Sequence, residues 1–381
     1  MPLSRAFLAL RLRMGFNMSN YYLIFVWIGI FAFAAWFIQM QRVEYVEGVK
    51  VLRMQPLPAA VLVFPLVLWT AVRGYVMDTG AYMQMFRDLP FGLAAIPEYM
   101  AGVDKDEGFY LVSAVLKALV TEDVRVYFFI VGAFQAFLLF RIYRKYSGRY
   151  VISFFLFIAS TDYVSWMFNG MRQFVAVTIT LAAFEFILDK KYIKAILIIL
   201  FASLFHQSAL IVIPFVFIVQ GRAWNKRTLF FLALSFIAVV YVDQFTDILD
   251  TMLQETQYKN VVSDWNEWQD DGTNMLRVLV YSVPSILSLV GLRYIRAEDS
   301  RLINVCTNMS IISMGLYIIS MFTSGIFIGR LPIYFSLYNY ILLPWQIDHM
   351  FEEKSAKLVY GVMMAAYLGF YLIQVRMWGL V

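Results

Sequence analysis

The chain has few of the residues from which metal and redox sites are built. Its 381 residues include one cysteine, Cys306, and two histidines, His206 and His349. A single cysteine excludes an intramolecular disulfide and a cysteine-ligated zinc site, and the two histidines are too far apart in sequence to suggest a histidine-rich metal site. We therefore expect neither a metal nor an organic cofactor.

Charged residues are also scarce. They make up 15% of the chain, whereas soluble domains contain roughly 25%, and 61% of the residues are hydrophobic. Several uncharged runs are long enough to cross a hydrocarbon core of ~30 Å. These runs are 21–41, 54–72, 126–140, 195–221, 228–242, 278–292, 302–329, 331–347 and 358–375. The sequence therefore predicts a membrane protein.

The runs are apolar on every face, which is typical of helices. We predict an all-α polytopic protein in which residues 1–381 form a single integral membrane domain with about twelve transmembrane helices. Two large polar loops, 74–123 and 243–274, interrupt the spans. Within the first loop, the apolar segment 108–120 measures only about 20 Å as a helix and is expected to be interfacial or re-entrant.

The charge distribution predicts which loops lie on which side. The net charge is +5, and the basic residues lie in short loops beside apolar runs, which indicates topology rather than nucleic-acid binding. The basic connections Arg141–Arg149, Asp189–Lys194, Gly221–Arg227 and Arg293–Arg301 are predicted to be cytoplasmic. The acidic stretches Asp78–Asp123 and Asp243–Asp271 are predicted to be outside.

Parity then constrains run 195–221, because it joins two connections that are both predicted to be cytoplasmic. Its 27 residues span about 40 Å as one helix, so two short or re-entrant helices with an outer tip at 205–208 fit better. One tilted helix is the alternative. For the N-terminus, parity favours the outside and Arg5, Arg11 and Arg13 favour the cytoplasm. Met18 is an alternative start.

Two arginines stand out beside apolar spans, where charges are costly and usually functional. Arg172 lies between Asn169 and Gln173, and their i, i+3, i+4 spacing predicts one helical face. Arg330 is the only charge between Arg301 and Asp348, with Tyr334 four residues later. The alternative for both arginines is snorkelling to lipid headgroups.

Other polar residues are weaker candidates. His206, in an uncharged run, is expected either to be a hydrogen-bonded core residue or to accept a proton or bind a phosphate at the outer tip. Asp78 and Tyr82 share a helical turn. The D-x-D formed by Asp104 and Asp106 is used by some sugar transferases to bind divalent cations, but it is too short to be specific.

Together these side chains suit a substrate with a phosphate and a hydroxyl. Arginine binds phosphate oxygens in pairs and stabilises a departing pyrophosphate, while a carboxylate or histidine removes a hydroxyl proton. The chemistry suggested is glycosyl transfer from a lipid pyrophosphate. From the residues alone, phosphate transport or lipid handling fits as well.

Five motifs in order resemble those of the EpsG family of bacterial envelope proteins. They are Val72-Arg73-Gly74-Tyr75-Val76-Met77-Asp78, Glu107-Gly108-Phe109, Asn169-Gly170-Met171-Arg172-Gln173, Phe205-His206-Gln207-Ser208-Ala209 and Gly329-Arg330-Leu331-Pro332-Ile333-Tyr334. The resemblance implies a Wzy-like polymerase with a fold like the C-type glycosyltransferases. Such an enzyme joins undecaprenyl-pyrophosphate-linked repeat units of O-antigen, capsule or exopolysaccharide at the periplasmic face of the inner membrane. The family usually has Gly-x-Asp in the first outer loop, and the departure here leaves the role of Asp78 open.

The resemblance also implies roles for individual residues. Arg172 and Arg330 would clamp the pyrophosphate, with Asn169 and Gln173 orienting Arg172, and His206 or Asp78 would be the acceptor base. The expected substrate-binding residues are Arg73, Tyr82, Glu107, Asn169, Gln173 and Tyr334.

The substrates implied are undecaprenyl-pyrophosphate-linked oligosaccharides among membrane lipids, with a chain-length regulator and a flippase as candidate partners and no nucleic acid. Trp265, Trp268, Asp270 and Asp271 are expected to form either a sugar-binding lid or a solvated connector. The alternative functions are a transporter or flippase for a polyprenyl-linked saccharide, and an envelope-modifying acyl- or phospho-transferase.

Overall fold

The computed structural model describes residues 22–46, 49–242, 273–323 and 327–380, together with positions 244, 245, 248, 251 and 325. Its internal contacts fall into two compact units. Unit 1 comprises Met1–Glu185, Ile193–Leu210 and Tyr360–Val381, and unit 2 comprises Phe186–Tyr192 and Ile211–Val359. The predicted lid residues Trp265, Trp268, Asp270 and Asp271 lie outside the described residues.

Unit 1 is helical, with one small sheet. Its elements, in chain order, are α2 (Leu23–Phe37), β1 (Gln41–Val46), β2 (Val49–Met54), α3 (Pro56–Val72), α4 (Thr79–Asp88), η2 (Leu93–Ala95), α5 (Ile96–Met100), α6 (Glu107–Leu119), α7 (Val124–Tyr146), α8 (Tyr150–Ala159), the π-helix η3 (Tyr163–Asn169), α9 (Met171–Ala182), and most of α11 (Tyr192–Ser203), η4 (Gln207–Ile211) and α20 (Glu353–Met377). Helix α10 (Phe184–Leu188) crosses between the units.

Helices α3 and α7 form an antiparallel pair at the centre of unit 1. They approach closely at Gly132, where an added Cβ would lie 2.4 Å from Thr70 Oγ1. That hydroxyl donates to the Phe128 carbonyl at 3.0 Å, so a small residue allows a polar contact between two apolar helices. The pair gives unit 1 two distinct ends.

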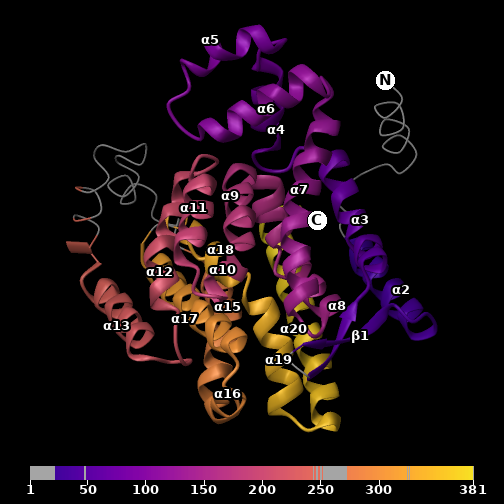
Figure 1. Ribbon diagram of the computed structural model, residues 1–381, viewed down its shortest axis with the longest axis vertical. Helices are drawn as coiled ribbons and strands as arrows, with labels where there is room; N and C mark the ends of the chain where they lie inside the picture. The colour runs from indigo at the N-terminus through magenta and orange to yellow at the C-terminus, as the bar shows by residue number, and fades with distance from the viewer. Residues whose placement is uncertain are drawn as a thin grey trace. The chain divides into compact units, whose positions relative to one another are not determined.

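Different structures occupy these ends. Helices α4, α5 and α6 of the first polar loop lie where α7 begins (Figure 1). Where α7 ends, strands β1 and β2 form an antiparallel hairpin in which Gln41 pairs with Met54. Glu44 of the hairpin contacts both Arg42 and Arg53 at 2.7 Å. The hairpin was not predicted from the sequence.

Unit 2 is built around one buried helix. Its elements are α12 (Val212–Ile218), α13 (Lys226–Val240), α15 (Met275–Val290), α16 (Leu292–Glu298), α17 (Arg301–Met321), η6 (Ile328–Arg330), α18 (Ile333–Ser336) and α19 (Asn339–Met350). Helices α13, α15, α18 and α19 pack on α17. Asn304 and Asn308 accept hydrogen bonds from the backbone of Ala223 and Trp224, which fixes the 221–225 loop to the core.

The helices support an all-α membrane protein, but the count of twelve crossings is not confirmed. Within the described residues, three helices are individually long and apolar enough to cross a membrane: α7, α17 and α20. Two bent pairs, α8 with η3 and α15 with α16, bring the number to as many as five. Other predicted spans are apolar helices of 10–17 residues: Leu23–Phe37, Pro56–Val72, Met171–Ala182, Tyr192–Ser203 and Gln207–Ile218. The break predicted within 195–221 is confirmed, since α11 ends at Ser203 and η4 begins at Gln207.

Candidate functional site

Arg172, near the start of α9, contacts the acidic loop between α5 and α6. Its Nη1 donates to Asp106 Oδ2 at 2.8 Å and to the Tyr110 hydroxyl at 3.5 Å. The Asp106 side chain is 2% exposed, whereas that of Arg172 is 30% exposed. A buried carboxylate therefore orients a guanidinium that still has accessible surface. Arginine has five N–H donors, so this one can bind an anion while remaining paired with Asp106.

The surroundings of this ion pair are poor in water. Burial raises the pKa of the Asp106 carboxyl, and the Arg172 guanidinium partly opposes that shift. Asp106 Oδ1 is buried without a hydrogen-bond partner in the described part of the chain. Burial likewise raises the pKa of the nearby Tyr82 hydroxyl, again opposed by Arg172. Electrostatic interactions are stronger in such a setting than in water.

Gly108 explains how the α6 loop reaches the tip that follows α11. Its backbone N–H donates to the Leu204 carbonyl at 2.8 Å. An added Cβ would lie 2.9 Å from Leu204 Cβ and 3.0 Å from Leu204 O, so only glycine fits without movement. The Glu-Gly-Phe motif is thus a point of close backbone approach. It places Asp106, two residues earlier, near the segment that carries His206.

His206 is connected to α9 through Ser208. The Ser208 hydroxyl lies 2.7 Å from His206 Nδ1 and accepts a hydrogen bond from Gln173 Nε2 at 3.3 Å. The backbone N–H of Ser208 also donates to Nδ1, at 3.3 Å. Because a backbone amide can only donate, Nδ1 acts as an acceptor here, and the neutral ring then carries its proton on Nε2.

Asn169 does not share the α9 face with Arg172 and Gln173, as the sequence spacing predicted. It is the last residue of η3, and the chain turns at Gly170 before α9 begins. Its Oδ1 accepts a hydrogen bond from the Asp78 backbone N–H at 3.1 Å. The three residues therefore hold three different segments: the start of α4, the α6 loop and the tip after α11.

Arg73 is buried beneath this site. Its Nη1 donates to the Met167 carbonyl in η3 at 3.1 Å, and its Cζ lies 3.9 Å from the centre of the Phe128 ring. Backbone carbonyls at irregular helical turns need such partners. In this structure Arg73 supports the turn that carries Asn169. Its predicted contact with substrate is untested.

An apolar cavity of about 320 Å³ adjoins the polar residues. Its lining includes Phe109, which follows Gly108, Phe205, which precedes His206, and Val175 of α9. Helices α6 and α7 supply most of the rest. A polar group and an apolar tail of one ligand could thus be bound side by side in unit 1.

Arg330 and Tyr334 belong to unit 2. They do not share one helix: Arg330 ends η6, and the buried Tyr334 lies in α18 beyond Pro332. Arg330 itself is half-buried. Their predicted cooperation with Arg172 stays a prediction.

The comparison with protein families agrees with the motifs. Residues 57–378 match the model of the EpsG family. This chain belongs to the EpsG family. The family recognised from the five motifs is therefore confirmed. No curated protein and no solved structure matches the chain.

In this EpsG protein, unit 1 assembles most of the predicted site residues. Asn169, Arg172 and Gln173 contact segments that contain Asp78 and His206, and Tyr82 is buried near Arg172. Asp78 and Glu107 are exposed. Their predicted roles in proton transfer and sugar binding stay predictions.

Sequence reasoning missed three contributors to the EpsG site: Asp106, Tyr110 and Ser208. In the sequence, Asp106 stands out only as part of a weak D-x-D pattern, and the family resemblance points to its neighbour Glu107 instead. The structure separates the two acids of that pattern, because Asp104 is exposed and Asp106 faces Arg172. No acidic residue stands beside Arg172 in the sequence. An arginine next to an apolar span without such a neighbour indicates that a buried acid lies close to it in the fold.

Proposed function

We propose that this protein is a polysaccharide polymerase. It transfers an oligosaccharide repeat unit from undecaprenyl pyrophosphate onto the end of another lipid-linked chain, at the periplasmic face of the bacterial inner membrane. Membership of the EpsG family supports a role in exopolysaccharide assembly. The acidic loop that contributes Asp106 lies on the side that the charge rule assigns to the exterior.

The observation that carries this proposal is the ion pair between Arg172 and Asp106. A guanidinium held at 2.8 Å by a buried carboxylate, yet partly exposed, is positioned before substrate arrives. Preorganised donors of this kind stabilise charge that develops in a transition state. Here that charge develops on the departing pyrophosphate.

The reaction forms one bond and breaks another. An acceptor hydroxyl oxygen attacks the anomeric carbon of the donor sugar as the bond from that carbon to the pyrophosphate oxygen breaks. The hydroxyl proton passes to a base, and the lipid pyrophosphate leaves as an anion. Arg172 binds that anion, while Tyr82 and Glu107 contact the sugars.

The hydrogen bonds around His206 favour a role for His206 in binding phosphate and for Asp78 as the base. With Nδ1 accepting from the Ser208 amide, the neutral imidazole carries its proton on Nε2 and donates to a phosphate oxygen. The exposed carboxylate of Asp78 is then the better candidate for the base. Its position is fixed through its own backbone by Asn169.

The cavity beside the site supports a lipid substrate. Apolar side chains from α6, α7, α9 and α11 line it, which matches the apolar surface of a polyprenyl chain. We assign it to the first isoprene units of the polyprenyl tail. Its neighbours Arg172 and His206 would then meet the phosphates.

The experiment is polymerisation in nanodiscs with an undecaprenyl-pyrophosphate oligosaccharide, scored as product ladders. Removing one charge-stabilising donor typically slows a reaction about 10²- to 10³-fold, and we expect this of Arg172→Ala. Arg125→Ala is the matched control, because Arg125 is a half-buried arginine near the start of α7, outside the site.

Three results would decide the matter. Ladders lost with Arg172→Ala and kept with Arg125→Ala support the proposal. Unchanged ladders from Arg172→Ala remove the site assignment. Movement of the lipid-linked saccharide across vesicles without ladder formation from the wild type would favour the transporter instead.

A further inference from the structure

A second apolar cavity runs along α7 from Phe129, level with the cavity of the candidate site, to Arg144 near the end of the helix. It is a groove of about 490 Å³ between α3 and α7 that reaches the start of α8. Apolar side chains, among them Phe64, Val67, Phe129 and Phe137, line most of its length. The apolar cavity of the site borders other residues of α7, so the two cavities use different faces of this helix.

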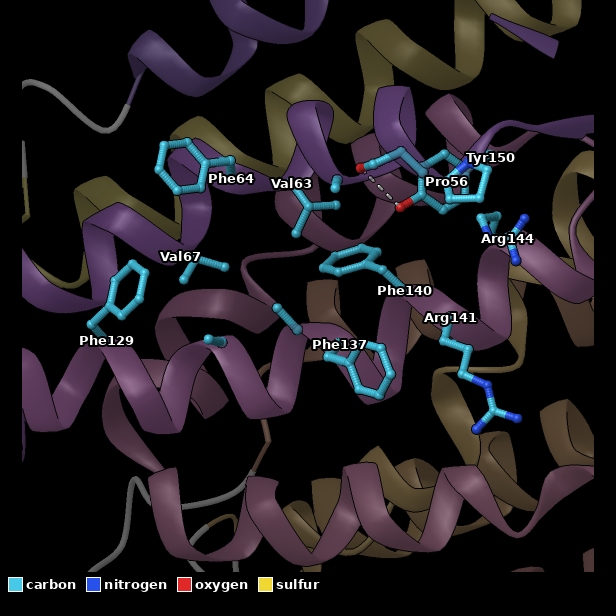
Figure 2. A pocket seen from close by; sticks show the side chains of 14 residues that line it. Pro56, Val63, Phe64, Val67, Phe129, Phe137, Phe140, Arg141, Arg144 and Tyr150 are labelled. Carbon is cyan, nitrogen blue, oxygen red and sulfur yellow. Dashed lines mark hydrogen bonds between the residues drawn. The ribbon is translucent and has the colours of Figure 1, made fainter. Parts of the chain in front are cut away.

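The groove is polar at one end only. Figure 2 shows Arg141 and Arg144 at one end and Phe64 and Phe129 at the other. Tyr150 also lies at the arginine end, where its hydroxyl donates to the Ala59 carbonyl at 3.4 Å. The cavity is thus amphipathic along its length, which is the pattern of a lipid with a charged head and an apolar chain.

The basic end has an excess of positive charge. Arg141 and Lys145 share one acid, Glu185, at 3.2 and 3.0 Å. Arg144 has a single, long hydrogen bond in the described part of the chain, to the Met54 carbonyl at 3.4 Å. Most of its five N–H donors thus remain available for an anion. Phosphate is a ligand that arginine binds with two parallel hydrogen bonds.

The length of the groove identifies the kind of lipid. The apolar wall on α7 runs from Phe129 to Phe140, which is about 16 Å at a rise of 1.5 Å per residue. This is half of a hydrocarbon core of ~30 Å. One acyl chain of a single leaflet fills that depth, and a headgroup then reaches the arginines.

We propose that this groove binds an anionic phospholipid from the leaflet next to the end of α7. One acyl chain lies between α3 and α7, and the phosphate sits between Arg141 and Arg144. By the charge rule this is the cytoplasmic leaflet, where basic pockets between transmembrane helices bind anionic headgroups. The site is separate from the polymerase site and does not depend on its chemistry.

Native mass spectrometry of the full-length protein tests the headgroup. Phosphatidylglycerol and phosphatidylcholine with the same acyl chains are added in turn to delipidated protein. We expect phosphatidylglycerol to bind at least tenfold more tightly, and the double variant Arg141→Gln/Arg144→Gln to lose this preference. Arg125→Gln, near the opposite end of α7, is the matched control. Equal binding of both lipids to the wild type, or an unchanged preference in the double variant, would overturn the proposal.

A second variant tests the apolar wall. Ala133 lines the groove and is half-exposed, so Ala133→Trp fills space without replacing a large core side chain. We expect it to reduce phosphatidylglycerol binding at least tenfold with little change in the unfolding temperature. Binding that persists in this variant would place the lipid elsewhere. Displacement of the bound lipid by undecaprenyl phosphate, but not by further phosphatidylglycerol, would also contradict the assignment.

Discussion

The guanidinium of Arg172 lies 2.8 Å from the carboxylate of Asp106, across 66 residues of sequence. The arginine comes from the start of α9 and the acid from the loop before α6. Around this contact, a glycine, an asparagine and a serine bring the other motifs of unit 1 together. The relationship makes Asp106 the residue on which the proposed site most depends after Arg172.

Asp106→Asn is expected to lower activity and raise stability. A charge-assisted hydrogen bond is worth ~1.5–3 kcal/mol, so losing the orientation of Arg172 should slow ladder formation by about tenfold or more. Because burial raises the pKa of Asp106, the ionised carboxylate is less favourable in the native state than in the unfolded state. The wild type therefore loses stability, relative to the variant, as pH rises through that pKa.

Thermal unfolding in detergent across a pH series measures this second effect. At pH 7 we expect a higher unfolding midpoint for the variant. The difference should shrink toward pH 4, near the ordinary pKa of an aspartate. A wild type that is the more stable protein at pH 7 would show that the ion pair outweighs the cost of burial.

Gly108→Ala is expected to destabilise the protein and reduce activity. The new Cβ would lie 2.9 to 3.0 Å from atoms of Leu204, and overpacking of this kind costs ~1–3 kcal/mol. Gly102→Ala is the matched control in the same loop, because its nearest atom would be 3.7 Å away. Similar unfolding temperatures for the two variants would show that the close approach of Gly108 to Leu204 does not matter for stability.

Ser208→Ala should impair the reaction without unfolding the protein. It removes the hydroxyl that joins Gln173 to His206, so the link from α9 to the imidazole is lost while the Ser208 amide still donates to Nδ1. We expect kcat to fall several-fold, and Ser208→Thr, which keeps a hydroxyl, to restore most of it. A double-mutant cycle with Gln173→Leu should be non-additive, since the two side chains share one network. Additive effects would mean that they act independently.

Arg330→Gln tests whether unit 2 contributes to the same anion site. If Arg172 and Arg330 bind one pyrophosphate, the double variant should be less impaired than the product of the single effects. Arg222→Gln is the control in unit 2, because this exposed residue pairs with Asp299 at 3.3 Å. Strictly multiplicative losses of activity would show that Arg172 and Arg330 act independently and do not bind the same anion.

The sequence predicted the fold well where hydropathy alone determines it. The uncharged run 54–72 contains α3, Pro56–Val72, and the chain breaks between α11 and η4 beside the tip predicted at 205–208. Hydropathy does not register local backbone conformation, and the predicted spans that differ do so for this reason. Thr161, with φ of 64°, separates α8 from η3, and the uncharged run 331–347 is divided between α18 and α19.

The hairpin of β1 and β2 has only a weak signal in the sequence. Polar and apolar residues alternate over 42–45 and again over 49–51, which is typical of strands but too short to predict a pair. The site was recognised through its motifs, but which acid faces Arg172 depends on a left-handed residue, Asp106 with φ of 53°. No spacing rule reveals that the chain turns there and buries Asp106 rather than Glu107.

The chain leaves helical geometry at Gly170, between η3 and α9, so this turn sets the direction of α9. A π-turn holds one more residue than an α-turn, and removing a residue from Tyr163–Asn169 would shorten the segment that leads into the turn. The start of α9 would then move relative to the loop before α6, and Arg172 would lose its 2.8 Å contact with Asp106. The length of η3 thus fixes the position of the arginine.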